Sequence, residues 1–392
     1  MIYLDHNATT PLDARVLDAM LPYFRDRFGN AASRQHAVGR RAAEAVESAR
    51  QQLADLLQAD PRELTFTSGA TEANNLAIKG FAAYHAAAVG ATGRHIITSS
   101  IEHPSVLAAC ERLAEEGWEL TTIDPTPQGL ITPEALAAAI RPDTVLVSIM
   151  LANHETGCLN DIAALAKLCK DRDIRFHTDA TQAVGKISVH VDTLDVEMLS
   201  LSAHKFYGPQ GVGALYTRRK RPRVRLQPLF EGGGHERGLR SGTLNLPGIV
   251  GLGEAARVAA KLMPNESPRL AQLRDRLENQ LLKALPHAQP NGHLERRLPH
   301  TTNLSVGYVD AERLIAAMPE LAVSSASACT TAAMQQSRVL KRMNVSEARA
   351  RASLRFGLGR GNTSDEIDAA IAIVIEAVRN YNPSETTCES RL

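Results

Sequence analysis

Short apolar runs alternate with helical segments through the first two-thirds of this 392-residue chain. Residues 37–59 carry apolar side chains at a spacing of three to four, which predicts a helix with one buried stripe. Five short runs between helical segments are predicted strands: Leu64–Thr67, His95–Thr98, Thr144–Met150, Arg175–Thr178 and Val196–Leu201. Runs of this length between helices predict an α/β fold, with a mostly parallel sheet covered on both faces.

The alternation weakens after about residue 255, and the segment MPNESP at 263–268 is predicted to be a linker or turn. A helix over 269–285, an extended segment near Thr302–Val306 and a strand near Leu354–Leu358 predict a smaller α+β domain. We expect residues 15–258 to form a large domain and residues 1–14 and 259–380 a small one. The polar tail 381–392 is expected to be disordered.

Composition excludes several classes of protein. The net charge is +1, so no global field would attract nucleic acid or an anionic membrane, and we expect neither partner. No apolar run approaches the roughly 18 residues that span a bilayer. The start MIYLDHNATTPLD lacks the apolar stretch of a secretion signal, which predicts a cytoplasmic location.

The five cysteines, Cys110, Cys158, Cys169, Cys329 and Cys388, are scattered, odd in number and never spaced as C-x-x-C. This pattern argues against a disulfide framework and against a structural zinc site. We therefore expect no metal and at least one free thiol.

A strand-to-helix turn is predicted at Thr65–Glu72, where TFTSGATE passes through a glycine. Backbone amides at such a helix start bind anions, and Thr71 adds a hydroxyl. Turns of this kind occur in most α/β proteins, so this motif alone leaves phosphate binding open.

Two charged residues follow predicted strands. Asp179 ends the strand in HTDATQ, and polar groups at the carboxyl ends of parallel strands face the ligand crevice. Asp179 could instead cap the next helix. Lys205 follows the strand in SLSAHKFYGP, where it could form a Schiff base with a carbonyl cofactor or lie on the surface.

Eight motifs, spread over about residues 2 to 378, resemble in order those of the cysteine desulfurases of the NifS/IscS kind. They are YLDHNATTP, TSGATEANN, SSIEHPSV, DATQAVGK, SLSAHKFYGPQGVGALY, GGGHERGLRSGTLN, SSASACTTAA and SLRFGLGR. The resemblance implies a fold-type-I transferase dependent on pyridoxal 5'-phosphate (PLP). It also implies a homodimer with active sites at the subunit interface, and L-cysteine as the substrate.

The resemblance further implies which residues bind PLP. Lys205 is expected to attach to it covalently, and Asp179 to pair with the ring nitrogen and keep it protonated. Gln182 and His154 are expected beside the phenolic oxygen. The expected phosphate-binding residues are Thr71, Ser202, His204 and, from the second subunit, Thr243, and Ala70 is also expected to bind the cofactor.

One position departs from the family pattern, because His154 stands where the family has a second asparagine before Glu155. A neutral histidine donates one hydrogen bond, as the asparagine does, so the role is chemically replaceable. The change could shift the pKa of the imine that the lysine forms with PLP.

For catalysis, the resemblance assigns His103 as a general acid or base on the ring face. By itself, such a histidine more often caps a helix or faces solvent. Arg355, helped by Asn30, is expected to bind the substrate carboxylate in a bidentate fork. Cys329 is expected to receive sulfur as a persulfide, while L-cysteine becomes L-alanine. A lone cysteine is usually buried in the core. The neighbours of Cys329 are small and polar, which favours a mobile loop instead.

Two other functions remain open on the residues alone. The first is another enzyme of this fold. An aminotransferase would have no need of Cys329, and a selenocysteine lyase could also act without it. A non-catalytic sulfur-relay or scaffold protein would not need the complete set of Lys205, Asp179, Arg355 and Cys329.

The sulfur-acceptor protein is not identified by the sequence. An iron–sulfur scaffold, a tRNA-thiolation relay and a DNA phosphorothioation system all fit. The C-terminal sequence NPSETTCESRL does not resemble the extension of housekeeping members, which favours a dedicated acceptor. The basic run at 218–225 could bind an acidic partner or be solvated surface.

Overall fold

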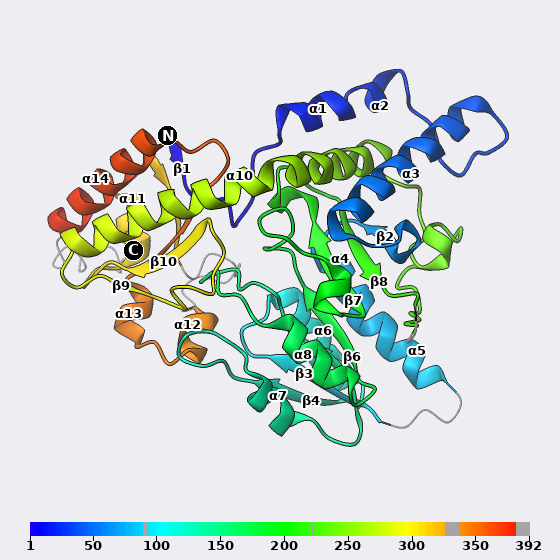
Figure 1. Ribbon diagram of the computed structural model, residues 1–392, viewed down its shortest axis with the longest axis horizontal. Helices are drawn as coiled ribbons and strands as arrows, with labels where there is room; N and C mark the ends of the chain where they lie inside the picture. Colours follow the sequence, from blue (N-terminus) through cyan, green and yellow to red (C-terminus); the bar gives the residue numbers. More distant parts are fainter. Residues whose placement is uncertain (89–92, 221–222, 326–336, 382–392) are drawn as a thin grey trace, which may run out of the picture.

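The structure, a computed structural model, describes residues 1–88, 93–220, 223–325 and 337–381. Cys329, Cys388 and residues 382–392 of the predicted tail lie outside the described residues. A seven-stranded sheet forms the centre of the larger part of the molecule (Figure 1). Its strands, in spatial order, are β2 (Leu64–Thr67), β8 (Gly213–Thr217), β7 (Met198–Ser202), β6 (Arg175–Asp179), β5 (Thr144–Ser148), β3 (His95–Ser99) and β4 (Glu119–Ile123).

The predicted mostly parallel sheet is confirmed. Strand β8 runs antiparallel to both of its neighbours, and the other neighbouring strands of this sheet pair in parallel. The five predicted strands are present to within two residues at each end. Strand β8 and the edge strand β4 were not predicted. In β4 only Ile123 is buried, so an apolar run could not reveal it.

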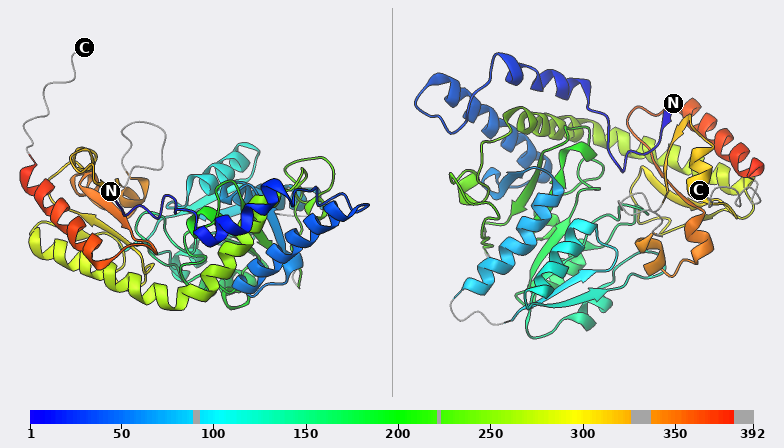
Figure 2. Two further views of the ribbon diagram at one scale, coloured as in Figure 1. Left: turned by 90° about the horizontal axis from the view of Figure 1, so that it is seen from above. Right: turned by 180° about the vertical axis from the view of Figure 1, so that it is seen from behind.

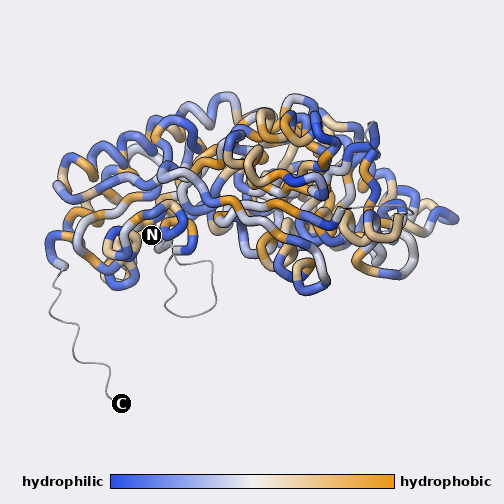
Figure 3. The backbone as a smooth tube through the Cα atoms, turned by 90° about the horizontal axis from the view of Figure 1, so that it is seen from below, coloured by the Kyte–Doolittle hydropathy of each residue, from blue (hydrophilic) through white to orange (hydrophobic). Residues whose placement is uncertain are grey.

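Helices cover both faces of this sheet, as predicted. In β3, Ile96 packs with Leu146 in one hydrophobic cluster, while the next residue, Ile97, packs with Val147 in another. Because successive side chains of a strand point to opposite faces, the two clusters lie on opposite sides of the sheet. Figure 3 shows the apolar strands enclosed between the helices.

The first face is covered by α4 (Ala70–Asn75), α5 (Phe81–Ala87) and α6 (Pro104–Glu115). The other is covered by α1 (Ala14–Met20), α3 (Ala37–Leu57), α7 (Pro133–Ala139), α8 (Ile162–Lys170) and the first half of α10 (Leu246–Ala284). Two short helices, α2 (Pro22–Arg25) and α9 (Val191–Leu194), complete this part. No helix in the described ranges is both long and apolar enough to cross a membrane.

A second, four-stranded sheet has its own hydrophobic cluster. Its strands, in spatial order, are β12 (Ser324–Ser325), β13 (Ser353–Gly357), β10 (Thr301–Ser305) and β9 (Gln289–Pro290). The helices that follow along the chain are α11 (Ala311–Ala316), α12 (Arg338–Arg342), α13 (Glu347–Arg351) and α14 (Ser364–Asn380). The extended segments predicted near residues 302–306 and 354–358 are β10 and β13. The exact domain boundaries stay a prediction.

The linker predicted at 263–268 is wrong, because α10 continues through it (Figure 2). Pro264 and Pro268 lie inside this 39-residue helix. Each proline removes one backbone hydrogen-bond donor, and for this reason the local sequence predicted that a helix ends here. Both halves of the helix are nevertheless buried: Leu252 packs in the core of the large sheet and Leu277 in that of the small sheet. Burial at both ends keeps the proline-containing turns helical.

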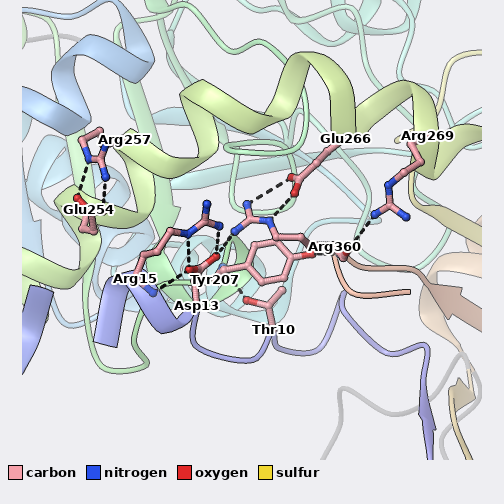
Figure 4. Close-up of polar contacts among 9 residues, drawn as sticks. All are labelled: Thr10, Asp13, Arg15, Tyr207, Glu254, Arg257, Glu266, Arg269 and Arg360. Carbon is pink, nitrogen blue, oxygen red and sulfur yellow. Dashed lines mark hydrogen bonds and ion pairs between the residues drawn. The ribbon is translucent and has the colours of Figure 1, made fainter. Parts of the chain in front are cut away.

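A polar network fixes the proline-containing part of α10 to neighbouring loops (Figure 4). Glu266 binds Arg360, which also pairs with Asp13 and lies 4.1 Å over the ring of Tyr207. Arg269 donates to the carbonyl oxygen of Arg360 at 2.7 Å. These contacts explain why the polar residues of MPNESP do not form an exposed linker.

The N-terminal segment connects the two sheets (Figure 2). Strand β1 (Ile2–Tyr3) pairs with β11 (Leu321–Ala322), and the backbone of Leu4 and His6 bonds Gly357 at the end of β13. A Cβ atom at Gly357 would overlap the side-chain oxygen of Asn7, so this close approach requires glycine. The chain then reaches the connection after β7 and enters α1.

Candidate active site

A cavity of about 430 Å³ lies where β6 and β7 end, beside the turn that leads into α4. In open α/β sheets, ligands bind at such strand ends. Nine residues that the sequence motifs had singled out line the cavity: Ala70, Thr71, His103, His154, Asp179, Gln182, Ser202, His204 and Lys205. Tertiary structure thus brings together segments that lie far apart in the chain.

Lys205 lies on the turn that follows β7, and its amine is held at the edge of the cavity. Nζ donates to the backbone oxygens of Asn7 and Ala8, both at 2.6 Å. Gln182 bonds the same segment, because its amide nitrogen donates to the Asn7 oxygen at 3.1 Å. Asn7 and Ala8 belong to the motif YLDHNATTP, but neither was predicted to contact Lys205.

Asp179 ends β6 and is buried. Its carboxylate accepts from the backbone amide of Thr181 at 2.9 Å and from the side-chain amide of Asn74 at 2.8 Å. Both donors are neutral, and no ion pair to Asp179 occurs in the part of the chain that the structure describes. A turn follows Asp179, so the alternative that it caps a helix is wrong. A ligand cation bound here would pair with this carboxylate.

His103 caps α6 and also lines the cavity, so a role in capping the helix is compatible with the expected role as a general acid or base. Nδ1 contacts the hydroxyl of Ser105 at 2.8 Å and its backbone amide at 3.2 Å. The ring meets that of His154 edge-on, with centroids 5.6 Å apart. Burial lowers the pKa of His103, so the ring is largely neutral near pH 7.

His154 is more deeply buried, and burial, followed by the nearby His103 and Arg355, holds its pKa well below its usual value. The ring is therefore neutral, and a neutral histidine is the form that was expected to replace the asparagine of the family. Nδ1 is buried without a hydrogen-bond partner among the described residues. The ring therefore has one nitrogen left to interact with a ligand.

The turn from β2 into α4 forms the other end of the cavity. Gly69 has a φ of 153°, a conformation that favours glycine. A Cβ atom at Gly213 would lie 2.8 Å from the Cα of Gly69, so the two backbones approach closely. Thr71 and His204 flank this turn, and burial lowers the pKa of His204 to about 4. The start of α4 offers backbone amides to an anion, and Glu72 in its first turn is paired with Arg240.

Arg355 does not line this cavity but lies next to it on β13. One terminal nitrogen donates to the backbone oxygen of His154 at 2.9 Å. The other binds the carboxylate of Asp5 at 2.7 Å and the hydroxyl of Ser324 at 3.1 Å. The side chain is 3% exposed. Asp5 was not among the predicted site residues.

Besides Arg355, two predicted residues do not line the cavity in the single chain. Asn30 is exposed between α2 and α3, where its side-chain oxygen accepts from the amide of Ala32 at 2.9 Å. Thr243 is also exposed. Thr243 was predicted to act on the second subunit, and both roles stay predictions.

The described cysteines are poor nucleophiles. Cys110, Cys158 and Cys169 are buried, and burial raises the thiol pKa of Cys110 and of Cys169 to about 12. Their thiols stay protonated and inert near neutrality. Cys329 lies outside the described residues, so its role stays a prediction. No cluster of three or more potential metal-binding side chains occurs in the described ranges.

Comparison with known proteins places the chain in a family. The sequence matches the family aminotransferase class-V over residues 2–370. It is 50% identical over 378 residues to cysteine desulfurase IscS of Anaeromyxobacter sp. (strain K), covering 96% of this chain and 92% of that protein. A solved structure of a NifS-like protein matches with a TM-score of 0.89 and 34% identity, covering 96% of this chain and 99% of that chain. SspA in complex with cysteine matches with a TM-score of 0.80 and 37% identity, covering 91% and 99%.

The chain therefore belongs to the class-V aminotransferase family of PLP-dependent enzymes. Within this family it is a cysteine desulfurase, like the relatives that share half of its residues. The predicted family, fold class, cofactor and enzyme class are confirmed.

The described cavity fits PLP on three observations. Asp179 offers a carboxylate without a cation, which suits a protonated ring nitrogen. His154 Nδ1 and Thr181 Oγ1 are buried without partners on residues that line the cavity, so polar groups are left for a ligand. Gly69, Ala70 and Thr71 line the cavity, so the start of α4 borders the space in which a phosphate would bind.

Proposed function

We propose that this cysteine desulfurase removes sulfur from L-cysteine by forming a persulfide on Cys329. The observation that carries the proposal is the cavity in which Lys205, Asp179 and His103 converge. The sequence motif around Cys329 supplies the thiol, because the described cysteines are buried.

In this proposal, Lys205 holds PLP covalently and Asp179 keeps the ring nitrogen protonated. Gln182 and His154 lie beside the phenolic oxygen. The phosphate-binding residues are Thr71, Ser202, His204 and, from the second subunit, Thr243, and Ala70 also binds the cofactor. When bound, PLP supplies an electron sink for the bonds of the substrate's α-carbon.

Arg355, helped by Asn30, binds the substrate carboxylate. Lys205 moves the α-proton, and His103 handles the thiol proton as a general acid or base. The Cys329 thiolate then attacks the substrate sulfur, so that an S–S bond forms as the C–S bond breaks. The substrate carbon gains a proton and leaves as L-alanine, while Cys329 keeps the sulfur as a persulfide for an acceptor protein.

The proposed enzyme is a homodimer. Exposed large apolar side chains gather between residues 17 and 38, with Phe24 at 62% and Phe28 at 64% exposure. Such a concentration is typical of a surface that a partner covers. Asn30 lies in the same segment, so a second subunit packed there would change its surroundings.

The acceptor protein is proposed to dock partly through basic side chains. Arg219, Arg223 and Arg225 line a hollow of about 470 Å³ together with Arg62 and Arg237. Arg218 does not belong to this surface, because it is buried and paired with Asp195 at 2.8 Å. The iron–sulfur, tRNA-thiolation and DNA phosphorothioation pathways remain candidates. A cytoplasmic location and the absence of direct nucleic-acid or membrane binding stay part of the proposal.

A Cys329→Ser variant tests the central step. It should bind PLP and change its absorbance on addition of L-cysteine, yet release essentially no L-alanine, because a serine hydroxyl is not ionised near neutrality. Mass spectrometry after a pulse of L-cysteine should find the extra sulfur on the wild-type peptide that contains Cys329. Cys388→Ser is the matched control and should retain full activity. Sulfur on another cysteine would refute the proposed role of Cys329.

A further inference from the structure

The guanidinium of Arg355 already has a carboxylate partner in the single chain. Asp5 Oδ1 lies 2.7 Å from Nη2, and the two side chains are 18% and 3% exposed. Ser324 and the backbone oxygen of His154 complete the contacts of the terminal nitrogens. The remaining nitrogen, Nε, is buried without a hydrogen-bond partner among the described residues.

Asp5 is placed by the same segment that holds Lys205. Its backbone oxygen accepts from the amide of Ala8 at 3.0 Å, and it bridges to Gly357, two residues beyond Arg355. Asn7 and Ala8 accept hydrogen bonds from Lys205 Nζ. One short segment therefore contacts both the proposed carboxylate-binding residue and the proposed cofactor lysine.

An arginine buried without an anion would destabilise the enzyme before substrate arrives, because the charge has lost its hydration. Asp5 removes this cost in the free enzyme. A substrate carboxylate that binds the same guanidinium must then displace Asp5 or lie beside it. In either case Asp5 weakens the binding of the substrate carboxylate, because two like charges share one cation.

We propose that Asp5 is a specificity-determining residue that neutralises Arg355 in the free enzyme and gives way to the substrate carboxylate. This inference rests on the proposed role of Arg355. A substrate that carries a carboxylate replaces one anion by another, whereas an amine without a carboxylate leaves the Asp5–Arg355 pair intact. Asp5 thus sets the affinity for amino acids without touching the reacting sulfur.

Asp5→Asn in the PLP-loaded enzyme tests the proposal. The amide oxygen can still accept from Arg355, but the negative charge is gone. Propionate, which has neither the amine nor the thiol of cysteine, should bind about 10-fold more tightly, the scale of one charge-assisted hydrogen bond. A titration with ¹³C-labelled propionate, followed by NMR, measures this dissociation constant. The KM for L-cysteine should fall, while the KM for cysteamine, which lacks the carboxylate, should not.

Asp13→Asn is the matched control, because Asp13 pairs with Arg15 and Arg360 outside the cavity. It removes the same charge and should leave propionate binding unchanged. Unchanged or weaker propionate binding in a folded, PLP-loaded Asp5→Asn enzyme would overturn the proposal, since Asp5 would then only position Arg355. Arg355→Lys separates the two ideas: if it leaves propionate binding unaltered, the proposed role of Arg355 itself has failed.

Discussion

The two ends of the site treat their carboxylates in opposite ways. At the end of the large sheet, Asp179 receives hydrogen bonds only from neutral groups, Asn74 and the amide of Thr181, among the described residues. Beside the small sheet, Asp5 is paired with the cation of Arg355. The first arrangement leaves a negative charge for a bound cation, and the second neutralises a positive charge until another anion arrives. The difference supports the proposal that one end keeps its ligand and the other exchanges it.

The largest effect should come from Lys205→Ala, which breaks the end that keeps its ligand. Without the amine, PLP has no covalent anchor and the α-proton no carrier, so essentially all activity should be lost. Borohydride reduction followed by peptide mapping should label the Lys205 peptide in the wild type only. Lys186→Met, the control, removes another buried lysine and should keep the label. Label on any other lysine would contradict the assignment.

Two variants, Asp179→Ala and Gln182→Ala, compare the loss of a charged side chain with the loss of a neutral one at the same end of the site. Loss of the charge should lower kcat/KM by at least about 100-fold and weaken PLP retention, because the ring nitrogen loses its counter-ion. Loss of the amide should cost about 10-fold or less, the scale of one neutral hydrogen bond. Dialysis followed by absorbance of the retained cofactor gives a readout independent of turnover. Equal, mild losses would remove Asp179 from the role proposed for it.

Arg355→Lys probes the end that exchanges its ligand. Lysine keeps the charge but loses the planar fork, so the KM for L-cysteine should rise about 10- to 100-fold, the range of a charge-assisted hydrogen bond. The absorbance of bound PLP should not change, because Arg355 lies outside the cavity that holds it. Steady-state kinetics and a spectrum together make the test. A variant depleted of PLP would point to a structural arginine instead.

The smallest effect is expected at Lys186. Unlike that of Lys205, its buried amine has no hydrogen-bond partner among the described residues. It lies 4.5 Å over the ring of Tyr207. Burial lowers the pKa of Lys186 to about 7. Between pH 7 and about 10 the unfolded chain keeps this proton and the folded chain does not, so the free energy of unfolding rises with pH. Lys186→Met should remove that rise and raise the melting temperature at pH 7 by a few degrees. Parallel pH profiles of the two proteins would contradict the shift.

The parts of the site that the sequence determined are those that one element presents by itself. A strand followed directly by Asp179 or Lys205 places a polar group at a strand end, wherever the strand lies in the sheet. Only the resemblance of the motifs to the family predicted the full set of nine residues that line the cavity. The pattern of short apolar runs between helical segments also predicted the central strands, because the burial of a whole strand is visible in its own residues. It missed β4, whose residues are mostly not buried.

Only the tertiary structure decided the contacts between segments that lie far apart in the chain. Asp5 and Arg355 are separated by 350 positions, and no local pattern marks a carboxylate that will meet an arginine across that distance. The same holds for Asn7 and Ala8 on Lys205. The prolines of MPNESP signal a break locally, yet burial at both ends of α10 outweighs two missing donors. Local sequence fixes which groups an element presents, whereas packing alone determines which groups meet.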